Sequence, residues 1–335
     1  MNRRKMMNIA ILDDYQDVAA GFANWKTLGP DHKVSFFSDH IADPEALVER
    51  LLPFDIIMGM RERTPFPKSV LCQLPNLKLL ITSGARNASF DISAATDLGI
   101  TVCGTGGSGE GPTELTWGLI LNLLRNIPKE SALTKEGAWG TTMGTGLKGK
   151  TIGLLGLGHI GSLVAKVATA FDMRVIAWSQ NMDSAQATSN GASLVSKEEL
   201  FSLSDIVSIH VRLSDRTRNL VAAPELALMK PSSYIINISR GPIINETDLI
   251  AALTSQSIAG AGLDTFDIEP LPNNHPLLQL ENVLVTPHIG YVTHEAYGAY
   301  YGGTLENIQA FVSGAPVNMI NPEVFEKPTF RGVSK

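Results

Sequence analysis

The chain has 335 residues, of which 44% are hydrophobic and 18% are charged, and its formal net charge is −6. This length and composition suit two domains with buried cores and exclude a disordered protein. The negative charge disfavours nucleic acid and anionic membranes as partners, and no apolar run is long enough to span a bilayer. The basic start is followed by an apolar run too short for a signal peptide, so we expect a cytoplasmic protein.

Disulfides and catalytic metals are also disfavoured. The two cysteines, Cys72 and Cys103, are too few for a disulfide framework. The seven histidines form no HExxH motif and no cluster with cysteine, so we expect no metal site.

The first third of the chain alternates between apolar, strand-like runs and helical patterns. Asp43 is expected to cap a helix over residues 44–52, which begins with a proline. Such alternation is typical of a parallel sheet with right-handed crossovers, and it indicates a small α/β domain. The strands are expected at residues 7–12, 34–37, 56–60, 77–82 and 100–102.

A glycine-rich stretch at residues 104–112 interrupts this pattern and predicts a loop, which a helix at 113–125 follows. After a second glycine-rich stretch at 139–150 the alternation starts again and predicts a second α/β domain. A helical pattern over 293–312 has no partner strand nearby and could complete the first domain. The strands of the second domain are expected at 151–155, 174–178, 206–210, 234–238, 259–264 and 283–286, with one of its helices at 246–254.

The stretch TIGLLGLGHIG, at residues 151–161, combines an apolar strand with the spacing Gly156-x-Gly158-x-x-Gly161 and leads into a helical pattern. Gly156 permits the tight turn, Gly158 lets backbone N–H groups approach phosphates, and Gly161 lets the helix pack close to the strand. Glycine-rich turns are common in proteins. In the order strand, turn and helix, however, they predict that a dinucleotide diphosphate binds at the helix N-terminus.

Three later strand ends carry polar residues that could do chemistry at the edge where a parallel sheet binds ligands. Arg240 offers a fork of donors for a carboxylate or a polarised carbonyl. His288 can exchange a proton as an alcohol and a ketone interconvert, and Glu269 could hold its imidazole ring. Taken singly, the arginine could form a surface ion pair, and the histidine could make a structural hydrogen bond. Together, downstream of a dinucleotide turn, they favour an oxidoreductase site.

Four motifs, GLLGLGHIG, NISRGPIINETDLIAAL, GLDTFDIEPLP and TPHIG, occur in this order. They resemble the D-isomer-specific 2-hydroxyacid dehydrogenases, and the resemblance extends over about residues 7–312. It implies a Rossmann NAD(P)-binding domain at 113–292 and a flavodoxin-like substrate domain built from 1–112 and 293–335. It also implies a homodimer that transfers a hydride between NAD or NADP and a D-2-hydroxy or 2-oxo acid.

The same resemblance assigns roles to individual residues. The catalytic residues would be Arg240, Glu269 and His288, and the backbone at Ala85 and Arg86 would join Arg240 in binding the substrate carboxylate. The cofactor-binding residues would be Thr113, Gly156, Gly158, His159, Ile160, Gly161, Ser179, His210, Thr217 and Asp264, with Asp264 beside the nicotinamide.

Three positions depart from the family pattern. Where NAD-preferring members commonly have an acid at the end of the second strand, this chain has Ser179, and no Arg or Lys adjoins it. This favours NADP, or use of both cofactors, while NAD stays open. His159 stands where the family often has Arg, so diphosphate affinity could depend on pH. Arg86 replaces a frequent glycine, and it could favour a dianionic or bulkier acid or simply face solvent.

Two other functions fit the same fold. A cofactor-sensing regulatory protein would keep the glycine turn but would not need Arg240, Glu269 and His288. A formate-dehydrogenase-like enzyme would have Gln where this chain has Glu269.

Overall fold

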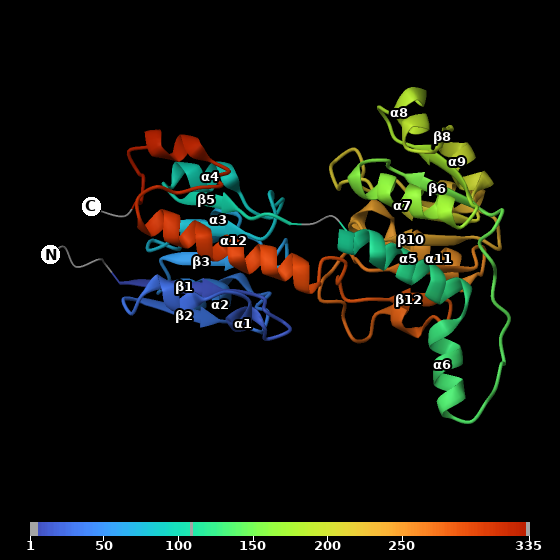
Figure 1. Cartoon of the computed structure of the whole chain (residues 1–335), viewed down its shortest axis with the longest axis horizontal. Coiled ribbons are helices and arrows are strands. Elements are labelled where there is room, and N and C mark those ends of the chain that lie inside the picture. The colour runs from blue at the N-terminus through green and yellow to red at the C-terminus, as the bar shows by residue number, and fades with distance from the viewer. Residues whose placement is uncertain (1–5, 108–109, 333–335) are drawn as a thin grey trace. The chain divides into compact units, whose positions relative to one another are not determined.

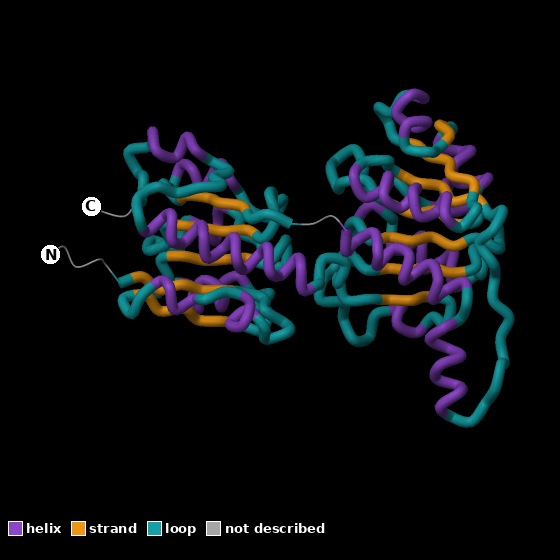
Figure 2. Tube along the Cα trace, viewed as in Figure 1, coloured by secondary structure: helices purple, strands orange, loops and turns teal. Residues whose placement is uncertain are grey.

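The computed structural model of the protein describes residues 6–107 and 110–332. The chain divides into two compact units, Met1–Ser108 with Thr293–Lys335 and Gly109–Val292. Each unit is built on one parallel sheet, drawn as orange strands in Figure 2. The predicted α/β class with two parallel sheets is therefore confirmed.

The first unit contains a five-stranded sheet in the order β2-β1-β3-β4-β5, which is the flavodoxin-like order (Figure 1). Every residue of β3, β4 and β5 is buried, as expected for parallel strands that are covered on both faces. The strands are β1 (Met7–Ile11), β2 (His32–Phe36), β3 (Ile56–Gly59), β4 (Leu79–Thr82) and β5 (Thr101–Gly104).

The helices of this unit include one that the chain reaches only after completing the second unit. This is α12 (His294–Val312), which contacts β4 and β5. Asp43 caps α2 as predicted, because its carboxylate accepts a hydrogen bond from Ala46 N at 2.9 Å. The other helices are α1 (Ala19–Phe22), η1 (Trp25–Leu28), α2 (Pro44–Leu51), α3 (Lys68–Leu71), α4 (Ile92–Asp97) and η4 (Pro322–Glu326).

The second unit contains a seven-stranded sheet in the order β12-β11-β10-β9-β6-β7-β8. The chain runs outward in one direction from β6 to β8 and in the other direction from β9 to β12, so the order reverses between β6 and β9. Ligands of open parallel sheets bind at such a reversal. The strands are β6 (Thr151–Leu155), β7 (Arg174–Trp178), β8 (Ser193–Leu194), β9 (Ile206–Ile209), β10 (Tyr234–Asn237), β11 (Gly260–Leu263) and β12 (Val283–Val285).

Two separate hydrophobic clusters form the core of this unit. One gathers apolar residues of α5 and α7 against the strands, and the other those of α9, α10 and α11. The helices are α5 (Glu110–Leu124), α6 (Ile127–Lys135), α7 (His159–Ala170), α8 (Ser184–Ser189), α9 (Lys197–Leu203), α10 (Ala223–Leu228), η2 (Gly241–Ile243), α11 (Glu246–Thr254) and η3 (Pro276–Gln279).

Helix α6 and the segment that follows it extend away from the body of the second unit (Figure 2). We call residues 127–146 the arm. No residue of α6 is buried, and the returning segment is held to it because Thr142 N and Thr141 Oγ1 donate to Glu130 Oε1 at 2.6 and 2.9 Å. The arm therefore has its own hydrogen bonds but no hydrophobic core.

The structure corrects several predicted bounds; for example, the strand expected at 34–37 lies at His32–Phe36, and the strand expected at 77–82 begins at Leu79. Helix α5 begins at Glu110 and not at 113, and β5 extends through Gly104, so the predicted loop at 104–112 is shorter. Residues 108 and 109 of that loop lie outside the described residues. Strand β8 and helix α6 were not predicted, because β8 has two exposed residues and α6 has no buried face, so neither carries an apolar pattern.

Within residues 6–107 and 110–332, no helix combines the length and the apolar character needed to cross a membrane.

Candidate active site

The glycine turn after β6 has the backbone that its sequence predicts. Gly156 has a φ of 101°, and a side chain there would come within 2.9 Å of the His210 backbone, so only glycine fits without strain. Gly161 lies in the first turn of α7, where a Cβ would collide with the Gly156 carbonyl. Gly158 directly precedes α7 and has open space at its Cβ position. The turn therefore leaves the N-terminus of α7, with its unpaired N–H groups, accessible to an anion.

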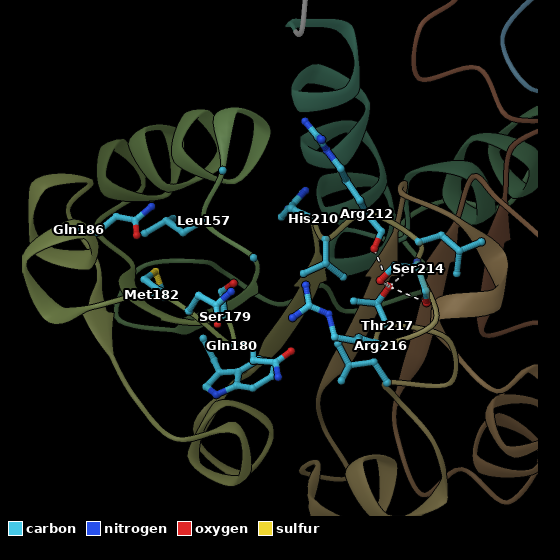
Figure 3. A pocket seen from close by; sticks show the side chains of 17 residues that line it. Leu157, Ser179, Gln180, Met182, Gln186, His210, Arg212, Ser214, Arg216 and Thr217 are labelled. Carbon is cyan, nitrogen blue, oxygen red and sulfur yellow. Dashed lines mark hydrogen bonds between the residues drawn. The ribbon is translucent and has the colours of Figure 1, made fainter. Parts of the chain in front are cut away.

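This turn borders a pocket of about 560 Å³ at the carboxyl ends of β6, β7 and β9 (Figure 3). Of the predicted cofactor-binding residues, Gly156, Gly158, Ser179, His210 and Thr217 line it. His159, Ile160, Gly161, Thr113 and Asp264 are not among the lining residues. The remaining lining residues are Leu157, Trp178, Gln180, Asn181, Met182, Gln186, Val211, Arg212, Leu213, Ser214, Arg216 and Leu220.

His210 and Thr217 contribute to the pocket in different ways. His210 Nε2 lies 2.9 Å from Ser208 Oγ, and burial lowers the pKa of His210 to about 3, so its ring is neutral at physiological pH. Thr217 Oγ1 donates to Arg212 O at 2.6 Å and accepts from Ser214 N at 2.7 Å. The Thr217 side chain therefore fixes the shape of the loop after β9.

Two arginines, Arg212 and Arg216, line the pocket together with Ser179, and Arg216 was not predicted at this site. The sequence has no Arg or Lys next to Ser179, but the loop after β9 brings both arginines to the pocket that Ser179 lines. The signal that could have found them is the topology, because β7 and β9 flank β6 on opposite sides and their carboxyl ends meet at one edge.

The three predicted catalytic residues follow β10, β11 and β12. Arg240 is held by its own loop, since Asn237 Nδ2 donates to Arg240 O at 2.9 Å and Arg240 Nη1 donates to Ser239 O at 2.6 Å. The next residue, Gly241, approaches the Phe266 backbone so closely that a Cβ would collide with it. The Arg240 segment therefore lies directly against the loop that carries Glu269.

Glu269 and His288 form a close pair. Glu269 Oε2 lies 2.6 Å from His288 Nδ1, and Glu269 Oε1 accepts from Phe266 N at 2.9 Å. Burial acts to raise the pKa of Glu269. The hydrogen bond and charge of His288, the Phe266 N–H and the charge of Arg240 outweigh burial and lower this pKa. The carboxylate is thus charged beside the imidazole, and the charge of Arg240 is close enough to act on it.

His288 is presented by a constrained backbone. Its φ is +53°, a left-handed value that is uncommon for residues other than glycine, and its side chain is 15% exposed. Its ring also packs edge-on against Tyr291, with centroids 5.5 Å apart. The ring is therefore held by Glu269 and Tyr291 while part of it stays accessible.

Asp264 anchors the loop that carries His288. Its fully buried carboxylate accepts from Thr286 Oγ1 at 2.6 Å, Ile289 N at 2.8 Å and Gly290 N at 2.9 Å. Burial raises the pKa of Asp264, against the effect of these hydrogen bonds and of the His288 charge. Both carboxylate oxygens thus bind the protein's own loop, and the nicotinamide contact stays a prediction.

The other predicted residues lie on separate elements. Thr113 is buried in the first turn of α5, and Ala85 and Arg86 are exposed in the first unit, just after β4. Their roles stay predictions. Among the described residues, no three or more His, Cys, Asp or Glu side chains cluster as a metal site would require.

The family is shown by comparison with known proteins. Residues 117–290 match the sequence model of the D-isomer specific 2-hydroxyacid dehydrogenase, NAD binding domain. Glyoxylate reductase of Aeropyrum pernix is 38% identical over 266 residues, with 76% of this chain and 79% of that protein covered. Glyoxylate reductase of Thermococcus litoralis is 34% identical over 305 residues, which cover 88% of this chain and 92% of that protein.

A solved structure points to the same family as these two sequences. The crystal structure of phosphoglycerate oxidoreductase from Vibrio cholerae is 37% identical, has a TM-score of 0.87 and covers 92% of this chain and 100% of that one. The chain therefore belongs to the D-isomer specific 2-hydroxyacid dehydrogenases, oxidoreductases that use NAD or NADP.

Proposed function

We propose that the chain transfers a hydride between NAD or NADP and a small 2-hydroxy or 2-oxo acid, with His288 as the general acid and base. The observation that carries this proposal is the distance of 2.6 Å between His288 Nδ1 and Glu269 Oε2. Because Nδ1 is engaged by the carboxylate, Nε2 is the ring nitrogen left to exchange a proton with a substrate.

The residues around the glycine turn fit a dinucleotide. The first N–H groups of α7, next to Gly158, suit the diphosphate, and the 560 Å³ pocket suits the adenosine half. When bound, the nicotinamide supplies or accepts the hydride.

The catalytic residues supply the remaining steps. In the reducing direction, Arg240 binds the 2-oxo acid and polarises its carbonyl group. His288 then donates the Nε2 proton to the carbonyl oxygen as the hydride adds to the carbonyl carbon, which gives the 2-hydroxy acid. The negative charge of Glu269 stabilises the protonated ring before this transfer. In the oxidising direction, His288 accepts the hydroxyl proton.

The relatives named glyoxylate reductase make glyoxylate the first acid to test. A panel of 2-oxo acids assayed with NADH and NADPH in parallel identifies the preferred substrate. No activity with any of them would favour a cofactor-sensing protein on the same fold.

The variant His288→Asn tests the assignment directly, since Asn tolerates the left-handed backbone and cannot act as an acid. We expect kcat to fall by about 10²–10⁴-fold with nucleotide binding unchanged. The matched control is His275→Asn, because His275 also pairs with a carboxylate, Glu246 at 3.0 Å, outside the catalytic residues. Full activity of His288→Asn would contradict the proposal.

We also infer that the chain works as a homodimer, with the arm as part of the interface. The arm exposes Trp139 and Met143, which are 88% and 94% accessible, and Ile127, which is 47% accessible. Large apolar side chains this exposed on a segment without a core are typical of a protein–protein interface. The cytoplasmic location likewise stays a prediction.

A further inference from the structure

The wall of the pocket beside β7 carries no acid. Ser179, Gln180 and Asn181 follow β7 directly, and all three line the pocket. In an NAD site, an acid at this strand end accepts hydrogen bonds from the ribose hydroxyls. Of the described residues that line the pocket, none has a carboxylate. A phosphate group on the ribose would therefore meet no like charge there.

Arg216 approaches this wall from the opposite side of the pocket. Figure 3 shows its guanidinium group extending from the loop after β9 towards the side where Ser179 and Gln180 lie. The second lining arginine, Arg212, points in a different direction in the same view. Arg216 is therefore the basic side chain best placed to meet a group bound near Ser179.

The charge of Arg216 is not used inside the protein. In the part of the chain that the structure describes, its guanidinium group makes no hydrogen bond or ion pair. The adjacent acid, Asp215, does not line the pocket. An arginine without a carboxylate partner can offer its full fork of donors to a phosphate.

The loop that carries Arg216 has a fixed shape. The Thr217 hydroxyl binds Arg212 O and Ser214 N, at 2.6 and 2.7 Å, which closes the turn around residue 216. Because the turn is already formed, less conformational freedom is lost when a ligand binds.

We propose that this pocket is a site for the 2′-phosphate of NADP, in which Arg216 binds the phosphate and the Ser179 hydroxyl donates to it. The enzyme then prefers NADP(H) to NAD(H). This assignment rests on the proposed dinucleotide binding and adds the choice between the two cofactors.

Binding of nucleotide fragments tests the site without any catalytic turnover. The full chain is titrated with 2′,5′-ADP and with 5′-AMP, which differs from it only by lacking the 2′-phosphate, and calorimetry reports the two dissociation constants. We expect 2′,5′-ADP to bind about ten to a hundred times more tightly, as charge-assisted hydrogen bonds to one phosphate predict.

The variant Arg216→Ala should remove most of this difference, leaving only the part due to Ser179, and should leave the affinity for 5′-AMP unchanged. Arg218→Ala is the matched control, since Arg218 is an exposed arginine of the same loop that does not line the pocket. Equal affinity of the unmodified chain for the two compounds, or an undiminished preference in Arg216→Ala, would overturn the 2′-phosphate site. Binding of neither compound would overturn dinucleotide binding itself, and this assignment with it.

Discussion

The carboxylate of Glu269 is held 2.6 Å from the His288 ring, and the Phe266 N–H fixes its other oxygen at 2.9 Å. The acid thus has one orientation, in which its charge acts on the imidazole. Its lowered pKa reflects the same contacts.

The first prediction concerns Glu269→Gln, which keeps the size of the side chain but removes its charge. We expect kcat to fall by about tenfold or more, because the protonated form of His288 loses its stabilising neighbour. A kcat equal to that of the unmodified enzyme would contradict the role of Glu269.

The same variant should alter stability in a pH-dependent way. The folded chain has a lower pKa for Glu269 than the unfolded chain, so the pair stabilises the fold above the unfolded pKa. This stabilisation disappears as the pH falls through the folded pKa. Thermal midpoints of the unmodified chain and Glu269→Gln should therefore differ at neutral pH and converge well below about pH 4. A constant difference at all pH values would show that the charge is not involved.

Asp264→Ala should destabilise the second unit. The substitution leaves the donors of Thr286, Ile289 and Gly290 without their buried acceptor, which costs about 3–5 kcal/mol of unfolding free energy. Asp264→Asn retains the shape and should fold, but its amide cannot accept all three bonds. We expect this second variant to lower kcat while affinity for 2′,5′-ADP stays the same, because the loop of His288 loses its anchor. Unchanged kcat in Asp264→Asn would argue against that anchoring role.

Ser179→Asp should shift the cofactor preference towards NAD. The new carboxylate would accept hydrogen bonds from the ribose hydroxyls of NADH and repel the 2′-phosphate of NADPH. We expect kcat/KM for NADPH to fall by about tenfold or more relative to that for NADH. Ser184→Asp serves as the control, since it adds the same charge on α8 outside the pocket lining. A fall of equal size in the control would indicate a general charge effect.

The arm can be tested through oligomeric state. Trp139→Ser combined with Met143→Ser removes the two most exposed apolar side chains of the arm, and light scattering should then report a monomer. Leu228→Ser, at a 42% exposed apolar residue on α10, should leave the dimer intact. A monomeric unmodified chain, or a dimer that survives the double substitution, would contradict an interface at the arm.

Much of the fold could be predicted because buried parallel strands and glycine turns leave strong local patterns. The strand before Gly156 and the polar loops at Arg240, Glu269 and His288 were recognised in this way. Arg216 was not recognised as lining the same pocket as Ser179, because the two residues belong to loops after different strands and come to one pocket only in three dimensions. Helix α6 left no signal, since it buries none of its residues within the chain.

The strand order reverses between β6 and β9, and this reversal separates the residues of the pocket from the three predicted catalytic residues along the chain. The pocket is lined from the ends of β6, β7 and β9, whereas Arg240, Glu269 and His288 follow β10, β11 and β12. No residue belongs to both sets. With the roles proposed above, mutations that change which nucleotide is accepted fall in stretches of sequence without Arg240, Glu269 or His288, so cofactor choice can evolve while the chemistry stays intact.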